Sequence, residues 1–355
     1  MYVMSTRGQE VRYQQADFKR FYGCAMIMGC LGFPKIRMYW SHEFQIPAIY
    51  NSMSRDKFLQ MRSDIHFADV SVPDPCNKLW RVQPVIDLVR NRCNNLATEI
   101  TQHLIDEQVV PFTGRCPARQ TIRSKPRPTG LKNLVCATVS GMIVDIEVFQ
   151  GAGTFQDCGL GHGASIIMRL TKHLPKGSHI YFDRFFTTIP LIQSVHQIGF
   201  HGTGIIMANR LDKNLKFPQD KEMNRGDIIQ FTNGDNVAVV KWKDSKGVVV
   251  VSSQCGKDPI GETDRWNKNM KRRCPVHIAK VIENYNELMG GVDIADQMLE
   301  YYRIKMKTRK WTVKVFFHFL DLAVFNSWME SKRDAKLAGL HRSKVKTFLT
   351  FEMKI

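Results

Sequence analysis

The feature that most constrains the fold of this chain is a change in the spacing of its apolar residues near residue 104. Between residues 15 and 105 they recur every three or four positions, which is typical of amphipathic helices. Beyond that point, the stretches 104–112, 132–141 and 142–151 are short and rich in Val and Ile, as β-strands are. We therefore predict a helical segment followed by a domain built around a sheet.

The order of elements after these strands narrows the fold class further. Ser140-Gly141 predicts a tight hairpin between the second and third strands. Helical patterns at 164–174 and from Thr188 onward alternate with strand patterns at 178–183 and 200–208. Three strands, a helix, a strand, a helix and a strand predict an α/β fold with a mixed sheet.

Residues 209–280 interrupt this order. Short Val- and Ile-rich runs are joined there by Asn233-Gly234 and by DSKG at 244–247, both of which favour β-hairpins. Helical patterns resume near Tyr285. We interpret 209–280 as a β-rich insertion.

The charge of the chain favours a polyanionic partner. Its 51 Lys and Arg exceed its 33 Asp and Glu, which gives a formal net charge of +18. Nucleic acid is the commonest partner of so basic a chain, although a merely soluble basic protein is the alternative. Residues 303–355 alone carry 13 basic and 4 acidic side chains, a net charge of +9. A second stretch has six basic residues and no acidic one: Arg115, Arg119, Arg123, Lys125, Arg127 and Lys132.

Within the basic C-terminal stretch, RIKMKTRKW at 303–311 alternates cations with apolar and aromatic residues. Such a segment could contact phosphates with its cations, or it could be one face of a solvated helix. Both interpretations remain open for each basic stretch. The basic residues of this segment are Arg303, Lys305, Lys307, Arg309 and Lys310.

Two further features exclude classes of protein. The longest apolar run, at 21–33, is shorter than the roughly 20 residues that cross a bilayer, so we expect a buried helix and no membrane association. The nine cysteines have irregular spacing and form no C-x-x-C pair, so we expect no structural zinc and predict reduced thiols in core positions.

Three carboxylates stand where a metal site could form. Asp183 ends an apolar strand, and open α/β sheets carry their sites at that edge. Asp106 in the first strand could share a Mg²⁺ ion with it, and Asp293 at the start of a helix could hold a second ion. Two such ions can activate water and stabilise the leaving 3′ oxygen of a phosphodiester.

Spacing alone does not make these assignments unique. Most carboxylates are surface charges, and Glu107, Asp145 or Asp157 could equally serve. Asp296 lies one helical turn from Asp293, either as a further metal ligand or as a polar neighbour. GLGHG at 159–163 lacks the G-K-[ST] ending of a phosphate-binding loop, so we interpret it as a turn.

At these same residues the sequence resembles the piggyBac transposase family, including the domesticated proteins derived from such elements. The resemblance extends over residues 17–330 in ordered blocks. The matching blocks begin with FYGCAMIMGCLGFPKIRMYW, MSRDKFLQMRSDIHFAD and NKLWRVQPVIDLV. They continue with IDEQVVPFTGRCPARQTIRSKPRPTGLK, GLGHGASIIMRLTKHLPKGSHIYFDRFFTTIPL and YNELMGGVDIADQMLEYYRIKMKTRKW.

The resemblance implies an RNase H-like catalytic core of the DDE/D class. Its catalytic, metal-binding carboxylates would be Asp106, Asp183 and Asp293, with Asp296 at a further acidic position. It also implies Mg²⁺-dependent cleavage and strand transfer of double-stranded DNA at TTAA sites, by a homodimer in the nucleus, with Mn²⁺ able to replace Mg²⁺. The implied organisation is helical at 1–100, core at 101–208, insertion at 209–280, core at 281–302, and helical and DNA-binding at 303–355.

Two departures from the family pattern bear on function. Arg184 follows the second Asp where many members have Asn, which adds a cation near the scissile strand. No Cys follows Cys274, whereas family members commonly carry a C-terminal Cys/His-rich domain that recognises transposon ends. We therefore expect a fragment, a truncated gene model or a domesticated derivative. The competing functions are a catalytically silent DNA-binding or chromatin protein and an interaction scaffold.

Overall fold

A computed structural model of the chain describes residues 13–123, 125–234 and 236–355. Its first part is helical, as predicted. Ser54 caps α4 by accepting a hydrogen bond from the Lys57 amide, which confirms the expected helix start. The elements of this part are α2 (Gln15–Leu31), the 3-10 helix η1 (Ile36–Trp40), α3 (Pro47–Tyr50), α4 (Arg55–Asp64) and α5 (Gln83–Asn94).

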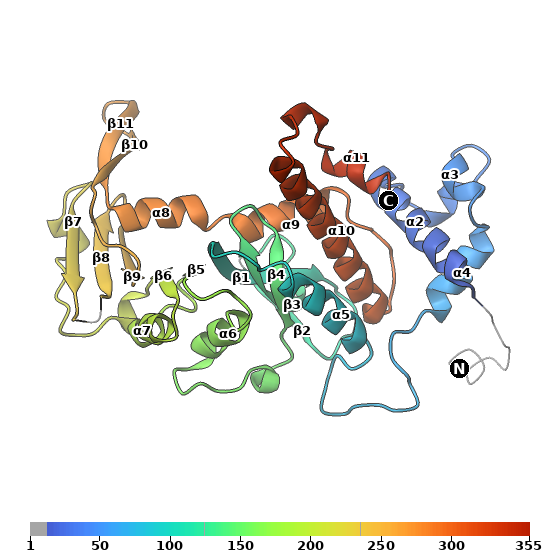
Figure 1. Ribbon diagram of the computed structural model, residues 1–355, viewed down its shortest axis with the longest axis horizontal. Helices are drawn as coiled ribbons and strands as arrows, with labels where there is room; N and C mark the ends of the chain where they lie inside the picture. The colour runs from blue at the N-terminus through green and yellow to red at the C-terminus, as the bar shows by residue number, and fades with distance from the viewer. Residues whose placement is uncertain (1–12, 124, 235) are drawn as a thin grey trace.

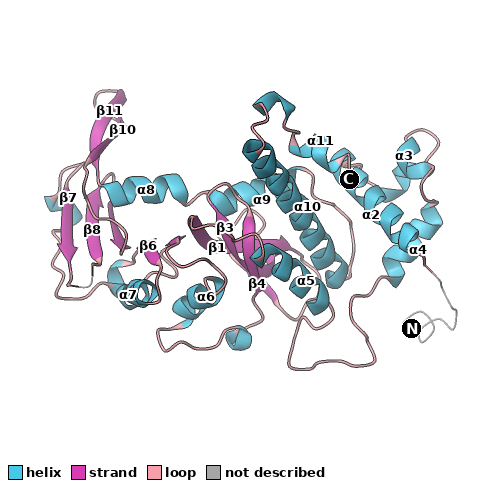
Figure 2. Cartoon of the chain, viewed as in Figure 1, coloured by secondary structure: helices cyan, strands magenta, loops and turns pink. Residues whose placement is uncertain are grey.

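The described residues form one nine-stranded mixed sheet, which confirms the α/β class (Figure 2). Its strand order is β2-β3-β1-β5-β6-β9-β8-β7, and β4 also pairs with β3. Strand β1 pairs antiparallel with β3 and parallel with β5. The strands that the apolar pattern predicts are β1 (Gln102–Pro111), β3 (Thr129–Thr138), β4 (Ile143–Val148), β5 (His179–Phe182) and β6 (His201–Ile205).

Helices cover both faces of this sheet (Figure 1). In that view α6 (His162–Leu170) and α7 (Ile189–Gln197) lie on one side, and α8 (Lys280–Leu288) and α9 (Gly291–Tyr301) on the other. Thr188 caps α7 through the Leu191 amide, as predicted. The long α10 (Trp311–Leu337) packs against α5 and α9, and the short α11 (Phe348–Glu352) follows it.

The predicted insertion is partly continuous with the main sheet. Its strands β7 (Ile228–Thr232), β8 (Ala238–Lys243) and β9 (Gly247–Ser252) extend the sheet because β9 pairs with β6. A second, smaller apolar core joins these strands to α8 and includes Trp242 of β8. Whether the insertion is a separate domain stays a prediction.

Some elements are not indicated by the apolar pattern. The strands β10 (Gly261–Asn267) and β11 (Arg272–Ile278) form a separate two-stranded ribbon of mostly half-exposed or exposed residues. The short β2 (Arg119–Thr121) pairs with β3. The remaining 3-10 turns are η2 (Ala152–Thr154), η3 (Ala208–Arg210), η4 (Asp220–Glu222) and η5 (Arg342–Lys344).

The expectation about the cysteines is only partly correct. All nine are free thiols, but only Cys24, Cys93 and Cys136 are buried. Cys76 and Cys158 are exposed, because each lies in a loop rather than on an apolar face. Among the described helices, none combines the length and apolar character that crossing a membrane requires.

Candidate active site

The parallel pairing of β1 with β5 brings two of the predicted aspartates together. Ile105 and Phe182 are direct partners in that register, so Asp106 and Asp183 follow them side by side. Successive residues of a strand alternate between faces, so the Asp106 carboxylate projects from the face opposite Ile105, while Asp183 directly follows the last residue of β5. The sheet therefore joins two residues that are far apart in the sequence.

The backbone around Asp183 is held by a tight turn. Its carboxylate Oδ1 accepts a 2.6 Å hydrogen bond from the Arg184 amide, and its carbonyl accepts one of 3.0 Å from the Phe186 amide. Tyr285 of α8 donates to the Phe182 carbonyl at 3.4 Å. Burial raises the pKa of the Tyr285 phenol, and the charges of Asp183 and Asp106 raise it further.

The helix α9 carries the other two predicted carboxylates across the same face. Gly291 allows this approach, because a Cβ there would lie 2.6 Å from Leu104 Cδ2 and would also collide with the Thr138 carbonyl. Asp293 is exposed in the first turn of α9. Asp296 is half-buried and accepts a 2.5 Å hydrogen bond from Gln108 Nε2 of β1.

The environment of this site raises the pKa of the Asp106 and Asp296 carboxyl groups. Burial raises the pKa of Asp106 to about 7, and the nearby Lys125 only partly offsets this. Burial also raises the pKa of Asp296. Lys125 Nζ lies 3.7 Å from Asp106 Oδ2. Burial alone would lower the pKa of Lys125, but the charges of Asp106, Asp296, Asp293 and Glu107 together raise it. The face therefore holds an excess of negative charge.

The chemistry of these side chains fits a hard divalent cation. Carboxylate oxygens are the ligands that Mg²⁺ prefers, and Glu107 Oε2 is buried without a hydrogen-bond partner among the described residues. In the part of the chain that the structure describes, no three His, Cys, Asp or Glu side chains are arranged closely enough to hold an ion as they stand. Asp106 and Asp183 are adjacent, while the charges of Asp293 and Asp296 act on Lys125 and, together with that of Asp106, raise its pKa.

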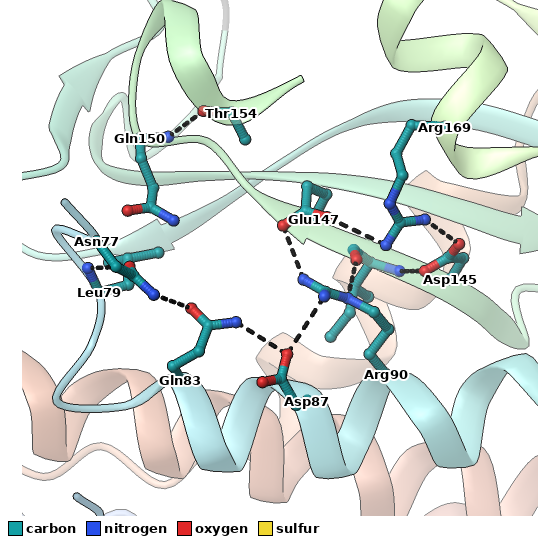
Figure 3. Close-up of polar contacts among 11 residues, drawn as sticks. Asn77, Leu79, Gln83, Asp87, Arg90, Asp145, Glu147, Gln150, Thr154 and Arg169 are labelled. Atoms are coloured by element: carbon teal, nitrogen blue, oxygen red, sulfur yellow. Dashed lines mark hydrogen bonds and ion pairs between the residues drawn. The ribbon is translucent and has the colours of Figure 1, made fainter. Parts of the chain in front are cut away.

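Asp145, which the sequence also allows as a ligand, belongs to a different network (Figure 3). Its Oδ2 lies 2.7 Å from Arg169 Nη1, and Arg169 also pairs with Glu147 at 3.1 Å. Arg90 of α5 reaches Glu147 at 2.7 Å and donates to the Ile146 carbonyl. These contacts hold α5 and α6 against β4. They give the buried Asp145 carboxylate a structural role that needs no metal.

Asp157 and Glu107, also allowed by the sequence, are placed differently from each other. Asp157 accepts a hydrogen bond from the Gly159 amide in an exposed turn, so it lies in a local motif of its own. Gly159 and Gly161 both have positive φ, 77° and 90°, so the GLGHG segment is a glycine-dependent turn leading into α6. Glu107 follows Asp106 on β1, and its charge raises the pKa of that carboxyl, so it remains compatible with the site.

The two basic stretches meet at a cavity of about 950 Å³. One wall is the loop on either side of β2, and the other is the segment between α9 and α10. The cavity joins residues that are almost 200 positions apart, which spacing alone could not show. The cations that line it are Arg115, Arg127, Lys307, Arg309 and Lys314.

Lys314 lies on the predicted helical tail, but the sequence pattern did not single it out. The sequence feature that could have identified Lys314 is its position four residues after Lys310, one helical turn beyond the basic segment. Burial lowers the pKa of Lys314, and Arg303 contributes to that lowering. The residues that line the cavity therefore include a half-buried cation.

The remaining predicted cations are placed differently from one another. Arg123, Arg184 and Lys305 are exposed. Arg119 donates to the carbonyls of Thr113 and Gly114, and Lys310 donates to the Ser63 carbonyl.

Arg303 differs from these cations because it is buried, at 7% exposure. Its Nε lies 3.1 Å from Glu300 Oε2. Its charge therefore contributes to the local electrostatic field, but its side chain is not exposed for contact with a partner.

Comparisons with known proteins identify the family of the chain. The family model described as transposase IS4 matches residues 3–328. The human piggyBac transposable element-derived protein 3 is 29% identical over 337 residues, covering 92% of this chain and 57% of that protein. The human piggyBac transposable element-derived protein 2 is 29% identical over 325 residues, covering 88% and 54%.

The chain thus spans about half the length of these curated relatives. A cryo-EM structure of a piggyBac transposase synaptic complex with hairpin DNA shares the fold. Its TM-score is 0.81 at 22% sequence identity, over 98% of this chain and 72% of that one. From the family match and these relatives, the chain belongs to the transposase IS4 family, in its piggyBac branch.

Proposed function

We propose that this chain is the catalytic part of a piggyBac-like DDE/D transposase, which cleaves DNA and transfers strands at TTAA sites. The observation that carries the proposal is the parallel register that sets Asp106 beside Asp183, with Asp293 brought to the same face by α9. These three would be the catalytic metal ligands, and Asp296 a further one. Bound Mg²⁺, or Mn²⁺ in its place, would supply charge for activating water and for stabilising the leaving 3′ oxygen.

The sheet supports an RNase H-like core at 101–208 and 281–302. An antiparallel set of three strands, β1, β3 and β4, is followed by the parallel strands β5 and β6. The helices α6 and α7 alternate with these later strands, as an α/β core requires. Residues 209–280 would be the family's insertion, and the helical flanks 1–100 and 303–355 would bind DNA and form a homodimer.

Double-stranded DNA is the partner that the charge favours. The 950 Å³ cavity lies between two basic stretches, and the exposed cations Arg123, Arg184 and Lys305 would add phosphate contacts beyond its walls. The solved relative is described with hairpin DNA. A DNA transposase acts on chromosomes, so we also propose a nuclear location.

A cleavage assay tests the catalytic assignment. Supercoiled DNA containing TTAA would be incubated with the chain and Mg²⁺, beside an Asp183→Asn variant and an Asp157→Asn control. We expect Asp183→Asn to lose cleavage while still binding DNA, because only a metal ligand has been removed. Asp157→Asn should cleave like the parent, since Asp157 lies in an exposed turn. Equal cleavage by Asp183→Asn would refute its assignment.

A catalytically silent DNA-binding protein is the second candidate function. It is favoured because, among the described residues, no three potential ligands are arranged closely enough to hold an ion as they stand. In that case neither the parent nor Asp183→Asn would cleave, and both would bind DNA with the same affinity.

Salt dependence tests the DNA contact in either case. Replacing Lys307 and Arg309 by Ala removes two cavity cations, so the slope of log affinity against log salt should fall by about 1.8. A matched control replaces Lys336 and Lys344, which are exposed and outside the residues that line the cavity. Equal effects of the two pairs would mean that the cavity is not the DNA contact.

A further inference from the structure

Lys125 lies among the carboxylates that the proposed function assigns to metal binding. Its ammonium is 3.7 Å from Asp106 Oδ2, and the two side chains are only 17% and 20% exposed. Asp293, Asp296 and Glu107 also act on it electrostatically. One cation thus lies within the field of four carboxylates, in a region that water reaches poorly.

We propose that Lys125 is a built-in counter-cation of this site, which occupies it in place of a divalent ion and must withdraw when the ion binds. This inference rests on the proposed function, because it assumes that Asp106 is a metal ligand. A half-buried carboxylate needs a cation nearby, and Lys125 provides one before any metal arrives.

The contact is suited to being temporary. At 3.7 Å it is longer than a hydrogen bond, so it is held by charge rather than by a directed contact. Lys carries its charge on a flexible four-carbon stem, unlike the rigid fork of Arg. Lys125 lies in the loop between β2 and β3, and the next two residues of that loop, Pro126 and Arg127, are exposed.

The withdrawn ammonium has a place to go. Lys125 also lines a neighbouring cavity of about 440 Å³, which Asp296 and Glu300 border as well. Two cations close to the same carboxylate repel each other strongly at low dielectric, so the ammonium and a divalent ion exclude one another near Asp106. A released Lys125 would then be free for the phosphate contact predicted from the sequence.

The first test measures metal binding without DNA. Mn²⁺ would be titrated into the full chain, and the free ion followed by electron paramagnetic resonance. Lys125→Met keeps the unbranched stem of the side chain and removes its charge, so we expect it to bind Mn²⁺ about tenfold more tightly than the parent. Lys125→Arg should bind like the parent or more weakly, and Lys305→Met, an exposed cation, should match the parent.

Adding Asp106→Asn to Lys125→Met should abolish the gain. Mn²⁺ affinity of Lys125→Met equal to or below that of the parent, or no measurable binding by either, would overturn the proposal. DNA cleavage is not part of the measurement. Tighter Mn²⁺ binding without any cleavage would therefore reject only the proposed function.

A second test uses the unaltered chain, so it holds even if Lys125→Met fails to fold. Lysine side chains would be acetylated briefly with and without saturating Mn²⁺, and the modified positions quantified by mass spectrometry. We expect Mn²⁺ to increase the labelling of Lys125 at least threefold and to leave Lys305 unchanged. Labelling of Lys125 that stays constant or falls would overturn the proposal.

Discussion

The side-chain amide of Gln108 donates a 2.5 Å hydrogen bond to Asp296, joining β1 to α9 across 188 residues of sequence. Gln108 is fully buried. Its carbonyl oxygen lies 3.1 Å from the Asn133 amide that donates to it and 2.9 Å from His318 Nε2. Burial holds the pKa of His318 well below its usual value, so the ring is neutral and donates from Nε2. The buried side chain of Gln108 thus fixes the orientation of the Asp296 carboxylate.

We expect Gln108→Leu to destabilise the fold by about 1–3 kcal/mol, because it leaves buried polar groups of Asp296, Asn133 and His318 without their partner. The free energy of unfolding can be measured with urea. Gln297→Leu is the matched control, since Gln297 is exposed and donates to the Tyr301 hydroxyl of its own helix. Similar losses in the two variants would contradict a special role for Gln108.

A pair of adjacent glycines gives a second prediction, concerning the position of α9. Gly291→Ala should push α9 away from β1 and β3, because its Cβ would collide with Leu104 and the Thr138 carbonyl. We expect a loss of stability of about 1–3 kcal/mol and a loss of DNA cleavage, since Asp293 moves with the helix. Gly290→Ala is the control, because nothing lies within 4 Å of its Cβ. Thermal unfolding and cleavage of the two variants should differ clearly, and matching behaviour would show that the close approach is unimportant.

The network in Figure 3 predicts that Asp145 matters for stability rather than for chemistry. Its side chain is 1% exposed, and Asp145→Asn would leave the Arg169 guanidinium with Glu147 alone, at a cost of about 3 kcal/mol. Asp87→Asn weakens the half-exposed pair with Arg90 and should cost less than about 1 kcal/mol. Denaturant midpoints distinguish the two. A reversed order would place Asp145 outside the structural network.

Local signals in the sequence predicted most of the core elements, because caps, turns and apolar spacing act over a few residues. The helix starts at Ser54 and Thr188 are confirmed. So is the turn at Gly141, whose φ is 97°. The ribbon of β10 and β11 was missed, since its residues are mostly polar and show no buried face.

Long-range pairing could not be obtained in the same way. Nothing local in β1 shows that it lies beside β5 or that Gln108 reaches Asp296. The cavity that joins Arg115 to Lys307 likewise depends on how distant segments pack. The proximity of the aspartates could be predicted only through their strand-end position and the family resemblance, and their roles as metal ligands stay predictions.

The C-terminal helix α11 gives a prediction about pH. Glu352 is buried at 6% exposure, and burial raises its pKa from 4.5 to about 7. Between these values the folded chain holds a proton that the unfolded chain releases, so the free energy of unfolding falls as pH rises from 4.5 to 7. Glu352→Gln stays neutral and should remove this fall, gaining about 1–3 kcal/mol over the parent at pH ~7.5 but little at pH ~4.5. Urea unfolding across this range would show it, with the exposed Glu43→Gln as control. Parallel stability curves for Glu352→Gln and the parent would mean that Glu352 is ionised at neutral pH without penalty.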